Sequence, residues 1–216
     1  HYPLRRQRQM CIRDREVRSP FAEAQQQKLR KLAQDALQVV LEAQEALQEF
    51  SVDSWAPEAY AAALAIAEAG DEAYRERLVV DAAAAYQEAA AALAVLEDSI
   101  PERAQEARFE TLAAIESGEA LRAQNQYRVL ALLEPGDPEL PRLLERIAKI
   151  PEVAAAVETA ADAARSGDTA AAVQAALTAS AADPQHQRVA ELLAQYQEAD
   201  ALARFRGAMS QGYTAL

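Results

Sequence analysis

Two stretches of the chain, GEALRAQNQYRVLALLEP (residues 118–135) and GDTAAAVQAALTASAADP (residues 167–184), follow the same pattern. Each begins with a glycine, carries an alanine five positions later (Ala123 or Ala172), and ends with a proline at the same spacing. Glycine ends a helix readily, alanine lets two helices approach closely, and proline stops a helix. The pattern therefore predicts pairs of antiparallel helices, with the glycine in the turn within each pair and the proline at its end.

The composition favours an all-α fold. One residue in four is alanine, the strongest helix former, whereas the chain has only 6 glycines and 9 prolines. A β-sandwich needs many β-branched and aromatic residues, and aromatic residues make up 6% of this chain. With 216 residues, the chain is long enough to bury a sizeable core.

An earlier segment, AIAEAGDEAYRERLVVDAAAAYQEAAAAL, fits the same pattern with different residues. Its glycine lies within the first helix, and small, aromatic and small residues follow at regular spacings. Where the first two units have a tyrosine, the third has Ala176. The residues predicted to pack the helices together are Gly70, Ala82, Tyr86, Ala89, Gly118, Ala123, Tyr127, Pro135, Gly167, Ala172, Ala179 and Pro184.

This order of glycine, small residues and terminal proline resembles the tetratricopeptide repeat (TPR), a helix-turn-helix unit of 34 residues. The resemblance covers about residues 56–216, although the tryptophan and the early leucine-glycine pair of that family are mostly absent. It implies a TPR-like solenoid of antiparallel helix pairs over residues 55–216. Because the final residues, AMSQGYTAL, stop inside an expected helix, we expect the chain to be a fragment with further repeats after it.

The third unit is longer than the repeat of that family. Gly118 and Gly167 are 49 residues apart, which is about 15 more than the standard repeat. Such an insertion amounts to about four helical turns, so it can lengthen a helix without rotating its apolar face. The added stretch contains Pro141 and Pro151. We predict a break or kink at Pro151 and an extra short helix between two repeats.

Ahead of the repeats, residues 20–54 are expected to form one long amphipathic helix and a turn. The apolar positions at helical spacing are Leu29, Leu32, Ala36, Leu37, Val40, Leu41, Leu47 and Phe50. Residues 1–19 differ, because RRQRQMCIRDR (residues 5–15) contains five arginines and Cys11, the only cysteine. This string resembles translated sequencing-adapter DNA, so we expect residues 1–19 to be a disordered basic tail that is foreign to the fold.

The charge excludes some classes of partner. The chain has a net charge of −12. The tail itself is positively charged, so the rest of the chain is more acidic still. An acidic surface repels nucleic acid and anionic lipid. The sequence has no run of 18 or more apolar residues, so we expect no direct membrane insertion within this fragment.

The sequence has few residues that could support catalysis. His1 and His186 are the only histidines, and we expect His186, just after Pro184, to be a solvated turn residue. No phosphate-binding loop, zinc-protease motif or nucleophile elbow occurs. We therefore expect no catalytic residues, no cofactor and no metal site, and we predict that the protein is not an enzyme.

The resemblance to the TPR family implies a concave groove lined mainly by the first helix of each pair. The groove positions that it assigns are Tyr74, Arg75, Arg108, Leu112, Ile115, Glu116, Val157 and Arg165, with Leu64, Ala67, Asp71, Gln105, Ala154, Ala161 and Ala164 beside them. Arg75, Arg108 and Arg165 have two interpretations. They bind an acidic partner through bidentate pairs, or they pair with neighbouring Glu and Asp on the surface.

Two functional hypotheses follow from these features. The first is a non-catalytic scaffold that binds a protein or peptide partner in the concave groove. The second is a structural helical spacer, or a self-associating coiled-coil stalk, because residues 20–50 have the length to pair with a copy of themselves. A looser resemblance to bacterial membrane-anchored repeat proteins would make the chain the extracytoplasmic part of such a protein, although the sequence does not determine its location.

Overall fold

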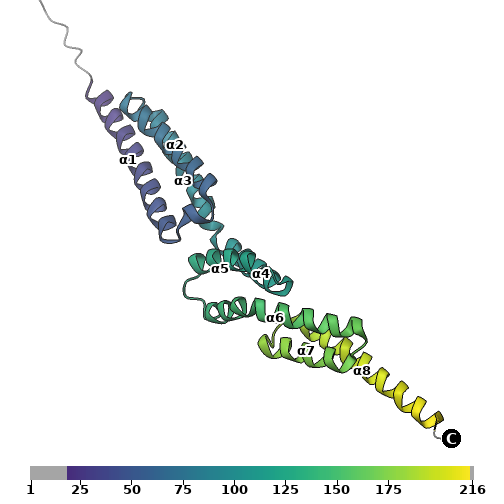
Figure 1. Cartoon of the computed structure of the whole chain (residues 1–216). Coiled ribbons are helices and arrows are strands. Elements are labelled where there is room, and N and C mark those ends of the chain that lie inside the picture. Colours follow the sequence, from purple (N-terminus) through teal and green to yellow (C-terminus); the bar gives the residue numbers. More distant parts are fainter. Residues whose placement is uncertain (1–18, 215–216) are drawn as a thin grey trace, which may run out of the picture. The chain divides into compact units, whose positions relative to one another are not determined.

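The computed structural model describes residues 19–214, and this part of the chain contains helices and no strands, which confirms the all-α prediction. The expected tail lies almost entirely outside the described residues. Figure 1 shows the order of the elements. They are α1 (Pro20–Glu49), the short 3-10 helix η1 (Val52–Ser54), α2 (Pro57–Arg75), α3 (Val79–Asp98), α4 (Ile100–Ser117), α5 (Ala120–Leu133), α6 (Leu140–Ser166), α7 (Thr169–Ala182) and α8 (Gln187–Thr214).

The described residues fall into two compact units, each with its own packing. The first unit comprises residues 19–47 and 57–95, which are most of α1, all of α2 and most of α3. The second comprises residues 48–56 and 96–214, which are η1 and the helices from α4 to α8.

In the first unit, α2 and α3 approach each other closely at Gly70. A Cβ atom at this position would lie 2.7 Å from Cε1 and 2.8 Å from Cδ1 of Tyr86, so only glycine fits without movement. The buried Tyr86 hydroxyl donates a 2.6 Å hydrogen bond to Asp71. Burial, and then this hydrogen bond, raise the pKa of Tyr86 to about 12.

The long helix predicted over residues 20–50 is present as α1, but its buried face is only partly the predicted one. Ala36, Val40 and Leu47 are buried as expected. Leu29, Leu32 and Leu41 are exposed, which corrects the prediction, and Ala33 is buried instead. The small Ala33 and Ala36 side chains therefore form part of the packed face, whereas these three larger leucines lie at its edge or in solvent.

In the second unit, α5 packs against α4, α7 packs against α6, and α8 packs against α7. Gly118 and Gly167 end α4 and α6 in the left-handed conformation, with φ of 76° and 83°. In each case the glycine N–H and the next N–H bond to carbonyls of the last turn, which is a Schellman motif. Both glycines thus make the turns that the sequence pattern predicted.

The predicted packing residues lie mainly inside the helix pairs. Tyr127 is half-buried against the core, while Pro135 and Pro184 are exposed in the turns that follow α5 and α7. The predicted alanines are all buried, namely Ala82, Ala89, Ala123, Ala172 and Ala179.

The structure corrects the interpretation of the added stretch. Residues 140–166 form the single helix α6 with Pro151 inside it, rather than an extra short helix with a break. Proline removes only the hydrogen bond to the carbonyl four residues earlier, that of Ile147. Ile147 and Ile150 pack into one hydrophobic cluster and Val153 into the next, so packing on both sides of Pro151 holds the helix together.

The joined helices α3 and α4 (Val79–Ser117) contain an 18-residue window with a mean hydropathy of 1.4. By length and composition alone, this stretch is apolar enough to cross a membrane, and it is the one such stretch among residues 19–214. Some of its residues, such as Ala82 and Leu93, are buried in the packing of the helices, but only 28% of the window is buried. The absence of membrane insertion therefore stays a prediction.

Candidate partner-binding groove

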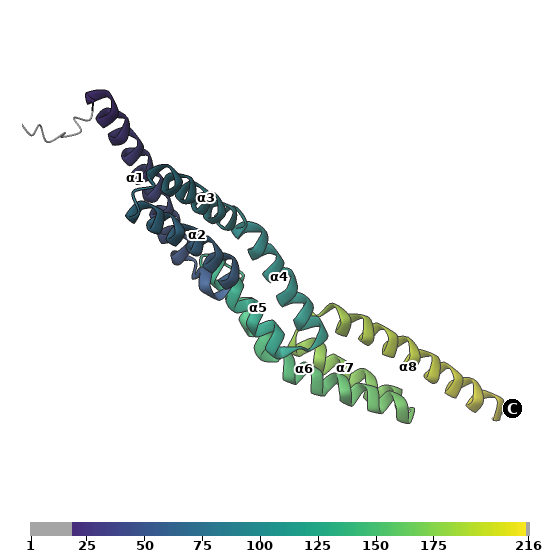
Figure 2. The ribbon, with the colours of Figure 1, turned by 90° about the horizontal axis from the view of Figure 1, so that it is seen from above.

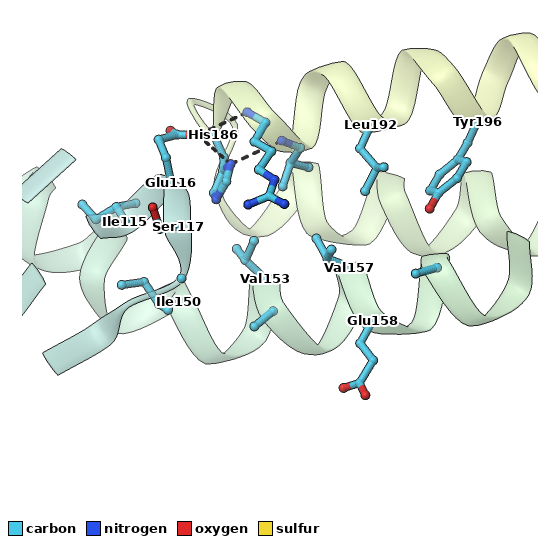
Figure 3. A pocket seen from close by; sticks show the side chains of 15 residues that line it. Ile115, Glu116, Ser117, Ile150, Val153, Val157, Glu158, His186, Leu192 and Tyr196 are labelled. Carbon is cyan, nitrogen blue, oxygen red and sulfur yellow. Dashed lines mark hydrogen bonds and ion pairs between the residues drawn. The ribbon is translucent and has the colours of Figure 1, made fainter. Parts of the chain in front are cut away.

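An open groove of about 450 Å³ lies in the second unit between α6 and α8, with the last turn of α4 at one end (Figure 3). We call it the α6/α8 groove. Its lining residues come from four places: Ile115, Glu116, Ser117 and Gly118 at the end of α4; Ile150, Val153, Ala154, Val157, Glu158 and Ala161 on α6; His186 before α8; and Arg188, Val189, Leu192 and Tyr196 on α8.

The two long walls of the groove are apolar. Val153 and Val157 on α6 stand one helical turn apart, as do Leu192 and Tyr196 on α8. Figure 3 shows Leu192 and Tyr196 pointing from α8 toward α6, whereas Glu158 points away from the groove. The groove therefore offers two facing rows of apolar side chains, with little charge along them.

The end of the groove nearest α4 is a buried polar cluster. Arg146 on α6 donates to Glu116 at 3.1 Å through its terminal nitrogen, and its Nε lies 3.1 and 3.0 Å from the two carboxylate oxygens of Asp183. The second oxygen of Glu116 lies 2.9 Å from Nδ1 of His186 and also accepts the backbone N–H of Arg188 at 3.2 Å. These contacts fasten the end of α4, the N-terminal part of α6 and the turn before α8 to one another.

The expectation that His186 is a solvated turn residue is wrong, since its side chain is buried against Glu116. A carboxylate 2.9 Å from Nδ1 requires a proton on that nitrogen, so the imidazole donates to Glu116. The backbone N–H of Val189 also lies 3.3 Å from Nδ1, but a protonated nitrogen accepts no hydrogen bond. We therefore assign the shorter contact as the hydrogen bond.

A related cluster occurs one helix pair earlier. Arg108 on α4 contacts Glu134 at 2.6 Å and Asp137 at 2.7 Å. Glu134 and Asp183 each precede the proline that ends a pair, so each pair has an arginine of its first helix bound to the acid before that proline. Asp137 and His186 also occupy equivalent positions in the two pairs, because each follows that acid by three residues.

The charges of this earlier cluster shift two pKa values. The backbone N–H of Glu139 lowers the pKa of Asp137, burial acts against this, and the Arg108 guanidinium lowers it further. Burial alone would lower the pKa of Arg108, but its hydrogen bonds to Glu134 and Asp137 outweigh burial and raise it. Arg108 thus follows the second interpretation of the arginines, pairing with neighbouring acids.

The structure gathers only some of the predicted groove positions. Ile115, Glu116, Ala154, Val157 and Ala161 line the α6/α8 groove together. Glu116 is not available as a ligand there, because both its carboxylate oxygens are already bonded. The other predicted positions lie elsewhere.

Leu112 packs against the core of the second unit, Gln105 is exposed, and Ala164 is half-buried. Arg165 is exposed and pairs with Asp162 of its own helix, as a surface arginine. The positions on α2 belong to the first unit and not to this groove, namely Leu64, Ala67, Asp71, Tyr74 and Arg75.

Sequence reasoning missed Arg146, Asp183, Leu192 and Tyr196, which the structure brings to this site. A signal for two of them was present. When the sequence is aligned with itself at the spacing between Gly118 and Gly167, Leu143 aligns with Leu192. The acids that precede the two prolines also align with each other. The first half of α6 and the first half of α8 are therefore equivalent helices.

Among residues 19–214, no group of three or more His, Cys, Asp or Glu side chains is placed to hold a metal ion. Comparisons of the chain with protein-family models, with curated proteins and with solved structures gave no match. The geometry of the groove is therefore the basis on which a function is proposed.

Proposed function

We propose that this chain is a non-catalytic protein-interaction scaffold, built from TPR-like helix pairs, that binds an apolar segment of a protein or peptide in the α6/α8 groove. The observation that carries the proposal is the open apolar groove, whose two walls carry half-buried apolar residues such as Val157 and Leu192. Repetition of the helix pairs supports the TPR-like interpretation.

The dimensions of the groove suit a short segment. From Ile150 to Ala161 the α6 wall extends roughly 16 Å, the length of about three helical turns or about five extended residues. The segment would supply apolar side chains spaced to fill both rows, as in helix-in-groove recognition.

The polar cluster supports binding by holding the groove in one shape. Glu116, Arg146 and Asp183 join three elements through ion pairs that are largely shielded from solvent, so the walls need little reordering when a partner arrives. Binding sites that are already ordered lose less entropy on association. The cluster is thus a positioning device, and the apolar rows provide the contacts.

The test is a random peptide display screen against the full chain and two matched variants. Ala154 and Ala155 are both exposed on α6, but only Ala154 lines the groove. We expect the chain to enrich peptides with apolar residues at helical spacing, A154R to lose them, and A155R to retain them. Peptides that bind A154R as well as the unaltered chain, or no enrichment at all, would count against this function.

A further inference from the structure

Arg188 carries an uncompensated positive charge at one end of the α6/α8 groove. It lies in the first turn of α8, which begins beside the end of α4 (Figure 2), and its backbone N–H bonds Glu116 there. The Arg188 side chain lines the groove and is exposed. It makes no ion pair with any residue between 19 and 214, so its guanidinium is free to bind a partner.

The other charged residues that line the groove are not available to a partner. Both carboxylate oxygens of Glu116 are bonded, and His186 is buried against one of them. Glu158 points away from the groove (Figure 3). An occupant of the groove therefore meets apolar walls along its length and a positive charge at the end nearest α4.

One helix pair earlier, larger side chains of α4 take the place of the α6 wall. At a distance of 49 residues in sequence, Gln105 aligns with Ala154, Arg108 with Val157, and Leu112 with Ala161. The Arg108 side chain reaches Glu134 and Asp137 in the turn before α6. In the later pair, Arg146 binds the equivalent acid, Asp183, from outside the groove. The space that Arg108 takes up in the earlier pair is therefore left to an occupant in the later one.

Both walls of the groove have the spacing that a helix recognises. The apolar residues stand at positions i, i+3 and i+7 on each wall, namely Ala154, Val157 and Ala161 on α6, and Val189, Leu192 and Tyr196 on α8. Helices that pack along one another in coiled coils use this spacing. The walls therefore suit a helical occupant whose own apolar residues follow the same spacing.

We propose that the occupant is a helix of a partner protein in which an Asp or Glu side chain, next to the first of its apolar residues, pairs with Arg188. Arg188 directly precedes Val189, the first apolar residue of its wall, so the two charges would flank the apolar contact as they do in coiled coils. The rest of the partner helix should be neutral or basic, because a chain with a net charge of −12 repels further acids. This inference rests on the proposed function and adds the charge and the orientation of the partner.

The experiment is selection from a library of random peptides, each fused at its C-terminus to the display protein so that it has no free terminal carboxylate. The full chain is compared with R188E and with R128E, which makes the same charge change at an exposed position of α5 outside the groove. The unaltered chain and R128E should enrich peptides with apolar residues at helical spacing and an acid at one end. R188E should enrich the same apolar pattern with Lys or Arg in place of the acid.

A binding measurement then isolates the charge pair. The probe is an enriched peptide, synthesised with an amidated C-terminus, and its counterpart with Gln in place of the acid. The exchange should weaken binding to the unaltered chain by about two- to fivefold and should leave binding to R188Q unchanged. Arg188 is exposed and its backbone N–H can still bond Glu116 in both variants, so the helical circular dichroism should not change.

The outcomes separate this inference from the proposed function. Apolar peptides that show no preference for an acid, or the same preference with R188E, would overturn the pairing with Arg188 and leave the proposed function standing. An equal loss of affinity with R188Q and the unaltered chain would overturn the pairing as well. A selection that enriches no apolar peptides at all would overturn both.

Discussion

Arg146 and Asp183 lie 37 residues apart in sequence, yet Nε of the arginine is within 3.1 Å of both carboxylate oxygens of the aspartate. The Asp183 side chain is only 3% exposed and that of Arg146 11%. Removing one member of a buried pair leaves the other charge without compensation. The pair therefore fixes the turn between α7 and α8 to the N-terminal part of α6.

D183N and R146M should each lower the free energy of unfolding of the second unit by about 3 kcal/mol. The measurement is urea denaturation followed by fluorescence of Trp55, the only tryptophan, which belongs to this unit and bonds the Phe50 carbonyl. As a control, R165M removes an exposed pair and should change stability by less than about 1 kcal/mol. Equal effects of R165M and R146M would contradict the assignment of a buried pair.

G70A should destabilise the first unit even though alanine favours a helix by about 1 kcal/mol over glycine. The new methyl group would lie too close to the Tyr86 ring, and overpacking of this kind costs about 1 to 3 kcal/mol. Thermal unfolding by circular dichroism measures the change. G207A, where an added Cβ atom meets nothing within 4 Å, should be neutral or stabilising.

Stability of the first unit should fall above pH 10. The pKa of Tyr86 is raised to about 12 in the folded chain, while the unfolded chain ionises near the usual value of 10. The full contribution is therefore present below pH 10 and is lost between pH 10 and pH 12, at up to about 1.4 kcal/mol per pH unit. Y86F removes the ionisation, so its unfolding free energy should decline less than that of the unaltered chain over this range.

Asp137 should make the second unit sensitive to acid. Its folded pKa lies below the usual value, so its contribution is present above that value and is lost as the pH falls through the folded pKa. Denaturation monitored at Trp55 between pH 6 and pH 2 should show this loss. D137N should be less stable at pH 6, and the two proteins should become similar at the acid end. A constant difference across the whole range would exclude this origin.

P151A should stabilise α6 by about 2 kcal/mol, because it restores a backbone N–H that can bond the Ile147 carbonyl. Pro151 is exposed, so the change removes no core contact. Helical circular dichroism and Trp55 denaturation both report the gain. A loss of stability would mean that the chain needs a break at this point, contrary to the continuous helix observed here.

Local patterns in the sequence were enough to predict helices, turns and the long first helix. Gly118 and Gly167 adopt the left-handed conformation because a helix end favours glycine there, and this is a property of neighbouring residues. The continuity of α6 could not be predicted in the same way. The local effect of Pro151 opposes a helix, and the packing that overcomes it comes from distant helices.

The candidate site was predictable only in part, for a similar reason. Of the ten positions at the end of α4 and on α6 that line the groove, five are among those that the resemblance to the TPR family assigned, Ile115 and Val157 among them. The environment of His186 could not be predicted in this way, because the carboxylate that it contacts belongs to Glu116, 70 residues earlier in the chain. The exposed leucines of α1 show the same limit, since helical spacing alone does not say which of two adjacent apolar rows will meet the neighbouring helices.

The length of α6 has a mechanical consequence. In a solenoid with the shorter repeat, the first helix of each pair packs mainly within that pair. When such a chain is pulled, the pairs can therefore unfold one after another. Here a single helix holds Ile150 in one hydrophobic cluster and Val153 in the next. Tension that unfolds either hydrophobic cluster also destabilises α6, and the other cluster depends on the same helix. The two neighbouring pairs should therefore unfold in one step.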